Sequence, residues 1–248
     1  MRDLGGRVLV ALAAAVAIVV AIGYGFIATN IASPAGNDLG TVEVPAEPGA
    51  EPVLLDDGRP AFVVRAERSV HVLDARVPRE PGSPGRLAAW CDGFLYDPLA
   101  DVVFAPDGRV RWGDGSDGLE AYDVELTDDG RAVVGHDGSP AGRAEGERPP
   151  SDGCDHVVHG PEPGDLFDPS VAANEEPPGW IWLEGRLEAV GDEVMLCDDP
   201  RADDCPTGAA VPGIDPATLL SLPGQLSGYF LGRVGDGVLD ELYYVPRG

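Results

Sequence analysis

Short runs of β-branched and aromatic residues, separated by Asp-Gly turns, restrict this chain to a β architecture. Asp107-Gly108 and Asp129-Gly130 supply the turn chemistry of tight hairpins. Outside the N-terminal apolar segment, no stretch shows a sustained helical period of apolar side chains. The strand candidates are Ala61–Ala66, Ser69–Leu73, Val102–Phe104, Arg109–Trp112, Ala121–Leu126 and Arg131–Val134. We therefore expect an all-β protein whose first domain spans residues 53–138.

Residues 179–248 form a second β-rich unit that looks like a small OB-like barrel. Trp180–Val190 alternates apolar and polar residues for part of its length, and Gly185 and Gly232 suit points where a barrel strand bends sharply. Asp215–Leu222 predicts one short helix, with Asp215 as N-cap and a proline at the first helical position. The further strand candidates are Val194–Cys197, Tyr229–Val234 and Leu239–Val245.

Two stretches rich in proline, glycine and acidic residues separate these units. Residues 30–52 have almost no large apolar side chains, which is typical of an extended linker. Residues 139–178 predict an irregular connector with a docked turn at residues 165–173. We expect two β domains joined by this connector.

Residues 8–28 form a segment of 21 residues without a charge or a proline. An α-helix of this length spans about 31 Å, enough to cross the hydrocarbon core of a bilayer. A cleaved signal peptide is the alternative, although its apolar region usually runs only about 7–15 residues. Arg2 and Arg7 precede the segment and acidic residues follow it. We expect residues 1–29 to anchor the protein in the cell membrane, with the N-terminus cytoplasmic and the remaining chain extracytoplasmic.

The chain carries a formal net charge of −26, and all 17 of its basic residues are arginine. This charge opposes binding to nucleic acid, and an acidic surface favours solubility. The lack of lysine excludes Schiff-base chemistry, and the abundant Ala, Gly, Pro and Asp indicate a high-GC bacterial genome. No Gly-x-Ser-x-Gly elbow or glycine-rich phosphate loop occurs, so we expect no enzyme activity.

Four cysteines follow the apolar segment and predict two disulfides. An oxidising exterior and an even count favour complete pairing. Cys197 and Cys205 would close a small loop and are the pairing we favour, which leaves Cys91 to pair with Cys154. Four cysteines allow three connectivities, so the spacing alone leaves the pairing open.

Residues 90–119, WCDGFLYDPLADVVFAPDGRVRWGDGSDGL, resemble the second half of a Rieske iron–sulfur domain. That half carries Cys-Pro-x-His-Gly-x-x-Phe, then an Asp-Gly turn and a Gly/Pro-rich loop. Counting back from Phe104 places the Cys and His positions of the family on Asp97 and Ala100. The first ligand pair, Cys-x-His, should lie shortly before Leu87, where this sequence has neither residue type.

The resemblance implies a Rieske-like fold that has lost its cofactor. Such a [2Fe–2S] cluster needs two thiolates and two imidazoles, and the matching segments supply none of them. We therefore expect no bound cofactor. The alternative is an electron-transfer protein whose cluster has atypical ligands, for which the candidates are Cys91, Cys154, His71 and His136.

Three groups of residues make divalent-cation binding a further alternative. The candidates are Cys154, His156 and His159 for zinc; Asp114–Gly118 with Glu125 for calcium; and Asp198, Asp199, Asp203 and Asp204 for weakly held cations. The zinc spacing is not that of a standard finger, and the calcium loop lacks a ligand and a glycine at its fifth and sixth positions. A disulfide with surface histidines, a turn and a solvated acidic loop are the simpler interpretations.

Trp180 and Trp182 lie on one strand face and are expected in the core rather than in a ligand cage. The sequence thus predicts a membrane-anchored, extracytoplasmic, non-catalytic binding or scaffolding protein. We expect it to act as an accessory subunit of a membrane protein complex.

Overall fold

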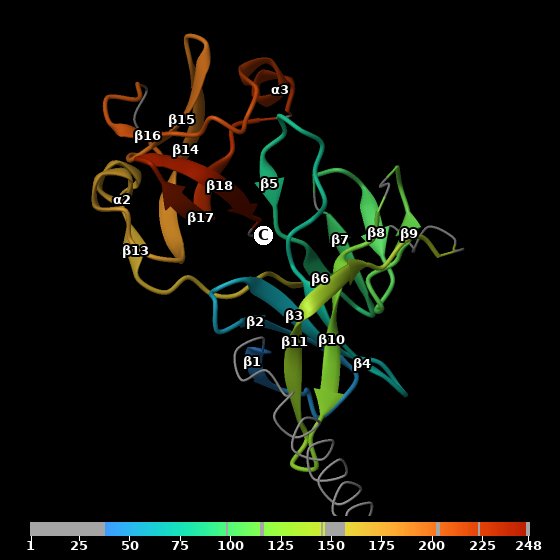
Figure 1. The fold of residues 1–248 in the computed structure, drawn as a ribbon. Helices are drawn as coiled ribbons and strands as arrows, with labels where there is room; N and C mark the ends of the chain where they lie inside the picture. The colour runs from blue at the N-terminus through green and yellow to red at the C-terminus, as the bar shows by residue number, and fades with distance from the viewer. Residues whose placement is uncertain are drawn as a thin grey trace, which may run out of the picture. The chain divides into compact units, whose positions relative to one another are not determined.

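The computed structural model describes residues 38–97, 99–114, 117–144, 146, 157–201, 204–222 and 224–246 (Figure 1). The expected membrane anchor lies outside these residues. Among the residues that the structure describes, no helix is both long and apolar enough to cross a membrane. From Leu39 onward the chain forms one compact unit that consists mainly of β-strands, as expected for an all-β protein.

The elements in chain order are β1 Asp38–Glu43, β2 Gly49–Leu54, β3 Pro60–Arg65, β4 Val70–Asp74, β5 Gly85–Arg86, β6 Ala89–Cys91, β7 Phe94–Asp97, β8 Val102–Phe104, β9 Val110–Trp112, β10 Glu120–Leu126, β11 Arg131–Pro140, β12 Val157–Val158, β13 Leu166–Phe167, α2 Pro169–Glu175, β14 Trp180–Val190, β15 Glu193–Cys197, β16 Gly208–Ala210, α3 Pro216–Ser221, β17 Ser227–Gly235 and β18 Val238–Val245.

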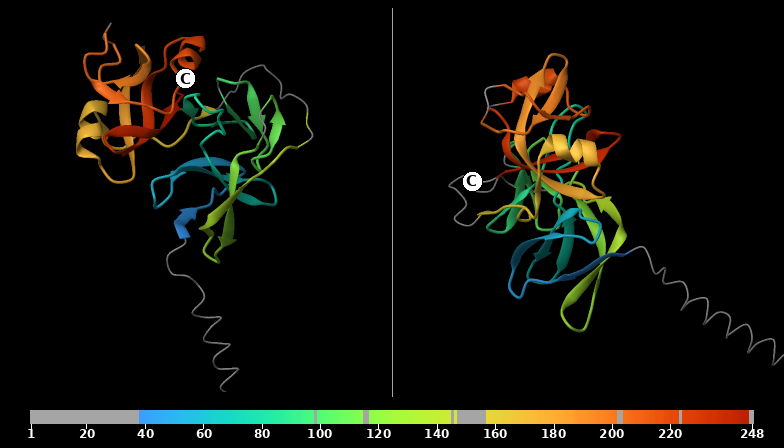
Figure 2. Two further views of the ribbon diagram at one scale, coloured as in Figure 1. Left: turned by 45° about the horizontal axis from the view of Figure 1, so that its top comes forward. Right: turned by 90° about the vertical axis from the view of Figure 1, so that its left-hand side faces the viewer.

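These strands form three sheets. The first has the order β1-β11-β10-β4-β3-β2, and the second has the order β12-β6-β7-β8-β9. The third has the order β16-β15-β14-β17-β18-β5, with β13 added in parallel beside β14. The strands of the third sheet, orange to red in Figure 2, curl around a core of their own.

The largest buried cluster takes side chains from all three sheets. It includes Phe62 and Leu73 of the first sheet, Leu95 and Phe104 of the second, and Trp182 and Leu231 of the third. A separate cluster lies on the opposite face of the first sheet, so β3 and β4 are buried on both faces. The three sheets therefore depend on one another for burial of their apolar side chains.

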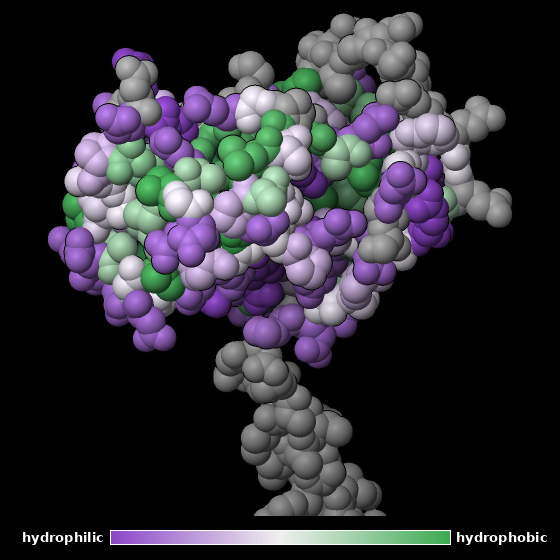
Figure 3. Space-filling model, turned by 90° about the horizontal axis from the view of Figure 1, so that it is seen from above, coloured by the Kyte–Doolittle hydropathy of each residue, from purple (hydrophilic) through white to green (hydrophobic). Residues whose placement is uncertain are grey.

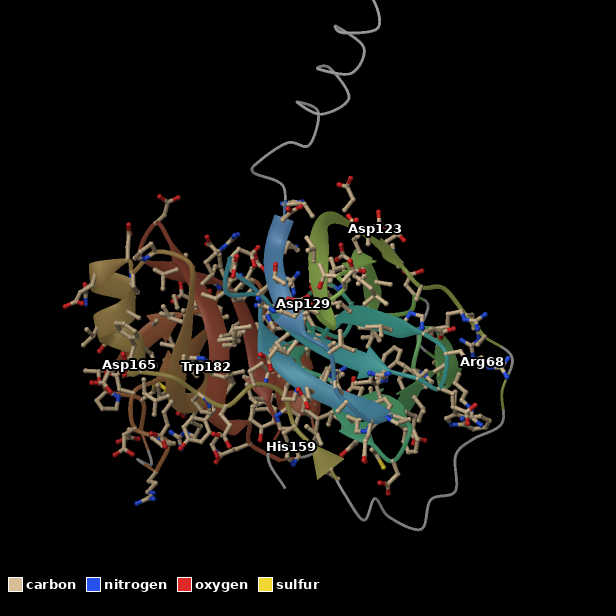
Figure 4. All side chains as sticks on the ribbon, turned by 90° about the horizontal axis from the view of Figure 1, so that it is seen from below. Arg68, Asp123, Asp129, His159, Asp165 and Trp182 are labelled. Atoms are coloured by element: carbon tan, nitrogen blue, oxygen red, sulfur yellow. A yellow bond between two sulfur atoms is a disulfide. The ribbon has the colours of Figure 1, made fainter. Side chains whose placement is uncertain are left out.

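The strands expected between Asp-Gly turns are confirmed. Val102–Phe104 and Trp180–Val190 have the expected bounds, and most other candidates differ by one or two residues. In the β10–β11 turn, Thr127 Oγ1 donates a hydrogen bond of 2.5 Å to Asp129, which is labelled in Figure 4. The predicted short helix is α3, and Asp215 caps it by accepting a hydrogen bond from the backbone N–H of Thr218.

The expected linker over residues 30–52 is wrong from residue 38 onward. The segment forms β1 and most of β2, and Leu39 and Val42 are buried in the cluster beneath the first sheet. A few well-spaced apolar residues suffice because the first sheet presents an apolar face for them to cover. The many proline, glycine and acidic residues of this stretch make the spacing of its few apolar residues hard to recognise from the sequence.

The expected connector over residues 139–178 also contains regular structure. β12 extends the second sheet, β13 extends the third, and α2 buries Pro169 and Ala172. β5 lies within the first expected domain, yet it pairs with β18 of the second. The division into two domains remains a sequence prediction.

Gly185 allows the close approach of β15 to β14. A Cβ atom at this position would lie 2.6 Å from the carbonyl oxygen of Cys197. That distance is far below a normal contact, so only glycine fits at this point of the curled sheet.

Arg76 connects the first sheet to the third. Its guanidinium Nη2 lies 2.5 Å from Oδ2 of Asp74, a carboxylate that is only 2% exposed, and Tyr122 donates a hydrogen bond of 2.6 Å to the same oxygen. The guanidinium also lies 5.4 Å from the ring centre of Trp180 and 5.7 Å from that of Tyr243. One side chain thus contacts groups from β4, β14 and β18.

Replacing Arg76 by alanine is expected to lower the free energy of unfolding by about 3–5 kcal/mol, because it leaves the buried Asp74 carboxylate without its cation. Urea denaturation monitored by tryptophan fluorescence measures the loss. Arg109→Ala is the matched control, since Arg109 pairs with Asp107 at the same spacing but its side chain is 50% exposed. An equal loss in both variants would contradict the role assigned to Arg76.

Tyr122 should make the protein sensitive to alkali. Burial, followed by the charge and hydrogen bond of Asp74, raises the pKa of the Tyr122 phenol. The folded protein therefore holds the neutral phenol, and its stabilising contribution is lost as the pH rises beyond about 10, where the unfolded phenol ionises.

We expect the free energy of unfolding of the wild type to fall more steeply above that pH than that of Tyr122→Phe, by up to about 1.4 kcal/mol per pH unit. Urea denaturation between about pH 8 and 11 measures both slopes. At neutral pH, the difference in the free energy of unfolding between the two proteins gives the effect of the substitution itself. Equal slopes of this free energy against pH above pH 10 would contradict the role assigned to Tyr122.

Candidate functional site

Three loops enclose a pocket of about 420 Å³. The first loop spans residues 77–86, the second follows β7 and the third follows β9. The lining residues are Val77, Pro78, Arg79, Glu80, Ser83 and Arg86 from the first loop, Asp97 and Ala100 from the second, Asp114 and Asp117 from the third, and Val102 and Phe104 of β8. The described lining therefore combines apolar and charged side chains.

The first loop is closed by its own hydrogen bonds. The backbone N–H of Val77 donates to the carbonyl of Arg86 at 2.9 Å, and Arg79 Nη1 donates to the carbonyl of Ser83 at 2.9 Å. Its tip is fixed as well, because the N–H of Asp215 donates to the carbonyl of Gly82 at 2.8 Å. The N-cap residue of α3 thus holds this wall of the pocket.

The second and third loops touch each other closely. Gly113 has φ +94°, and a Cβ atom there would lie 2.7 Å from the carbonyl oxygen of Asp101. The second loop turns sharply after β7, where Asp97 Oδ1 accepts a hydrogen bond of 2.9 Å from the N–H of Leu99. Glycine at position 113 is therefore required by both the backbone conformation and the space.

A buried ion pair joins the first loop to the second. Arg86 Nη2 lies 2.8 Å from Asp97 Oδ2, and the two side chains are 13% and 0% exposed. Oδ2 receives no hydrogen bond of good geometry from the described residues, so the contact at 2.8 Å acts through charge attraction. The pair closes the inner end of the pocket.

The structure places both degenerate ligand positions, Asp97 and Ala100, in this pocket. The segment before Leu87, where the resemblance puts the first ligand pair, forms the opposite wall. The described lining residues include no cysteine and no histidine, so they offer neither thiolate nor imidazole to an iron–sulfur cluster. Sequence reasoning missed Arg86 because it searched this segment only for Cys and His.

The three atypical ligand candidates that the structure describes do not line this pocket. Cys91 is buried in β6 and is disulfide-bonded, so its sulfur is not available as a thiolate ligand. His71 lies on β4, where its Nε2 is 2.8 Å from Ser69 Oγ, and His136 lies on β11. Cys154, the remaining candidate, lies outside the described residues.

The cysteine pairing is seen directly for one pair. Cys197 and Cys205 form the expected disulfide, with their Cα atoms 5.3 Å apart. Cys91 is also oxidised, whereas its expected partner Cys154 lies outside the described residues, as does His156 of the zinc candidates. His159 follows β12 (Figure 4).

The acidic candidates are dispersed. Asp114 lines the pocket, whereas Glu125 is exposed on β10 opposite Val133, as its strand assignment predicts. Asp198 accepts hydrogen bonds from both the side chain and the backbone of Ser170, and Asp199 accepts one from the N–H of Arg201. Asp204 is exposed, and Asp203 lies outside the described residues. Within the described part of the chain, only Glu188, Cys197 and Cys205 bring three potential ligand atoms within 4.8 Å of one another.

The tryptophans of β14 belong to the core, as predicted. Trp182 is only 5% exposed, and Trp180 packs beside Arg76 and Tyr243. Figure 4 labels Trp182.

Comparison of the sequence with known proteins finds no matching family model and no significantly similar curated protein.

We expect Asp97→Ala to lower the free energy of unfolding by about 3–5 kcal/mol, because it leaves the mostly buried guanidinium of Arg86 without a counter-ion. The double variant Arg86→Met/Asp97→Leu removes both charges and should regain most of this loss, since a well-packed apolar pair is often as stable as a buried ion pair. Urea denaturation of the two variants measures the difference. If the double variant is as unstable as the single one, the ion pair is not what joins the loops.

Proposed function

We propose that this chain is a non-catalytic, extracytoplasmic binding or scaffolding protein, held at the cell membrane by residues 1–29. It serves as an accessory to a membrane protein complex and recognises its partner or ligand through the pocket between the three loops. The observation that carries this proposal is the convergence of the three loops on one pocket whose described lining offers both charged groups and apolar surface.

A Rieske-like ancestry supports this choice of site. Strands β6 to β9 of the second sheet lie between β4 and β10 in the chain, and they carry the loops that the resemblance aligns with ligand segments. In this proposal the Arg86–Asp97 ion pair replaces the cluster as the connection between the loops, and the curled third sheet with α3 is the OB-like unit.

The chemistry of the pocket favours binding over electron transfer. A binding site is typically a concave apolar surface with a few fixed polar groups. Here Phe104 and Val102 supply apolar surface, while Arg79 and the Arg86–Asp97 pair supply charges. Electron transfer would require other ligands, and the disulfide of Cys91 removes one of those that the sequence suggested.

The surface of the protein suits a protein partner better than nucleic acid. The formal net charge of −26 repels polyanions. The face shown in Figure 3 carries apolar patches among hydrophilic side chains. Protein-binding surfaces likewise combine apolar and polar side chains.

Site-specific photocross-linking in intact membranes tests the binding role. A photoreactive side chain at Ala100, at the rim of the pocket, should capture one defined neighbour or ligand, whereas the same group at Ala46, exposed in the β1–β2 turn, should not. Ala100→Trp should fill the pocket entrance and abolish capture from a second probe at Asp114, while Ala46→Trp leaves it unchanged. Equal capture from both positions would contradict a role for the pocket.

Iron and acid-labile sulfide analysis of the purified full chain separates the two functions. We expect less than one iron per chain and no visible absorption of a [2Fe–2S] centre. A stoichiometric cluster would overturn the binding role and establish electron transfer.

A further inference from the structure

The Cys197–Cys205 disulfide lies beside a charged pair on the curled third sheet. Arg186 and Glu188 are two residues apart on β14, so their side chains share one face of the sheet. Cys197 is the register partner of Arg186 on β15 and therefore projects from that same face. The topology thus places a guanidinium, a carboxylate and a disulfide together.

The two cysteines of this disulfide differ in exposure. Cys197 is fully buried, whereas Cys205 is only half-buried. Thiol–disulfide exchange requires an attacking sulfur to reach one sulfur of the bond. An external thiol partner can therefore reach Cys205, while Cys197 becomes the internal thiol that closes or releases the bond.

The carboxylate of Glu188 lies close enough to Cys197 Sγ to accept the proton of the thiol in the reduced protein. Glu188 Oε2 is 3.8 Å from Cys197 Sγ, within hydrogen-bond range for sulfur, and Arg186 Nη2 holds the same oxygen at 2.6 Å. Arg186 is 6% exposed, and its Nε has no hydrogen-bond partner among the described residues. Glu188 is 31% exposed, so its carboxylate can exchange protons with solvent while it contacts the buried sulfur.

The other charged groups near the disulfide are engaged elsewhere or exposed. Asp198 is held by Ser170 of α2; burial opposes the effect, but these hydrogen bonds outweigh it and keep the pKa of Asp198 below its ordinary value. Asp199 accepts a hydrogen bond from the N–H of Arg201, and Asp204 is exposed. Glu188 is therefore the carboxylate that contacts the buried sulfur.

We propose that Cys197 and Cys205 form a thiol–disulfide exchange site for an external thiol or disulfide partner, with Glu188 as the general base for Cys197. This activity does not rest on the pocket or on its proposed binding role. It makes the disulfide a reversible two-electron site rather than a fixed crosslink.

The exchange balances in both directions. In the reduced protein Cys205 first loses its proton to water. The resulting thiolate attacks an external disulfide and forms a mixed disulfide with it. The first external thiolate leaves and takes up a proton. Cys197 then attacks Cys205 Sγ as Glu188 accepts its proton, the protein disulfide forms, and the second external thiolate leaves and is protonated. Two electrons pass from the protein dithiol to the external disulfide, and the reverse sequence oxidises an external dithiol.

Glu188→Gln tests the role of the base in the full chain, and Glu193→Gln, exposed at the far end of β15, is the matched control. The reduced proteins are mixed with oxidised glutathione, quenched with an alkylating reagent, and followed at Cys197 and Cys205 by peptide mass spectrometry. At about pH 6 we expect closure of the bond to slow roughly a hundredfold in Glu188→Gln only, the low end of a positioned general base. The difference should shrink steadily as the pH rises, because hydroxide then competes with Glu188 for the proton of the thiol.

The sign of the change separates catalysis from simple electrostatics. If Glu188 acts only through its charge, its removal favours the Cys197 thiolate and closure becomes faster at pH 6. A faster or unchanged rate would overturn the proposal.

A second pair of variants tests which sulfur meets the partner, without depending on Glu188. Cys197→Ser should leave a Cys205 that forms a mixed disulfide with glutathione, whereas the buried Cys197 of Cys205→Ser should stay unmodified in the folded protein. Equal modification of both variants, with unchanged urea midpoints, would contradict the assigned order of attack.

Discussion

The contacts of Arg76 join the first sheet to the third sheet, and the position of the pocket depends on them. Its guanidinium pairs with the buried Asp74, lies 3.5 Å from Glu241 and stacks against the rings of Trp180 and Tyr243. A planar guanidinium can do this because its edge binds carboxylates while its faces lie on aromatic rings, which an ammonium group cannot reproduce. The first loop of the pocket begins at the next residue, so its position follows from this anchor.

The walls of the pocket are joined by an ion pair between two of its loops. Loops that the Rieske resemblance aligns with ligand segments meet around Asp97 and Ala100, but Arg86 and Asp97 join them by charge. Such a pair fixes the loops without any redox capacity. Function resides in the groups that line a site rather than in the fold that presents them, so the frame alone argues for neither electron transfer nor catalysis.

Local patterns in the sequence predicted much of the fold but only half of the site. Strands such as Val102–Phe104 and Trp180–Val190 follow from β-rich runs bounded by turns, because these signals act over a few residues. The linker prediction failed because β1 is stabilised by the sheet it joins rather than by its own composition. Asp97 and Ala100 were found by motif position, whereas Arg86 was missed because its role depends on a partner across the pocket.

The sequence by itself determined where most of the strands run and where α3 begins, and it favoured the pairing of Cys197 with Cys205. Each of these depends on neighbours within about ten residues, whose backbone preferences and reach are written in the local order of residue types. Only the tertiary structure decided that Arg76 meets Trp180, that Arg86 meets Asp97 and that Glu188 meets Cys197. These contacts depend on sheet register and on packing between distant strands, and a shift of one residue in register would turn each side chain to the opposite face.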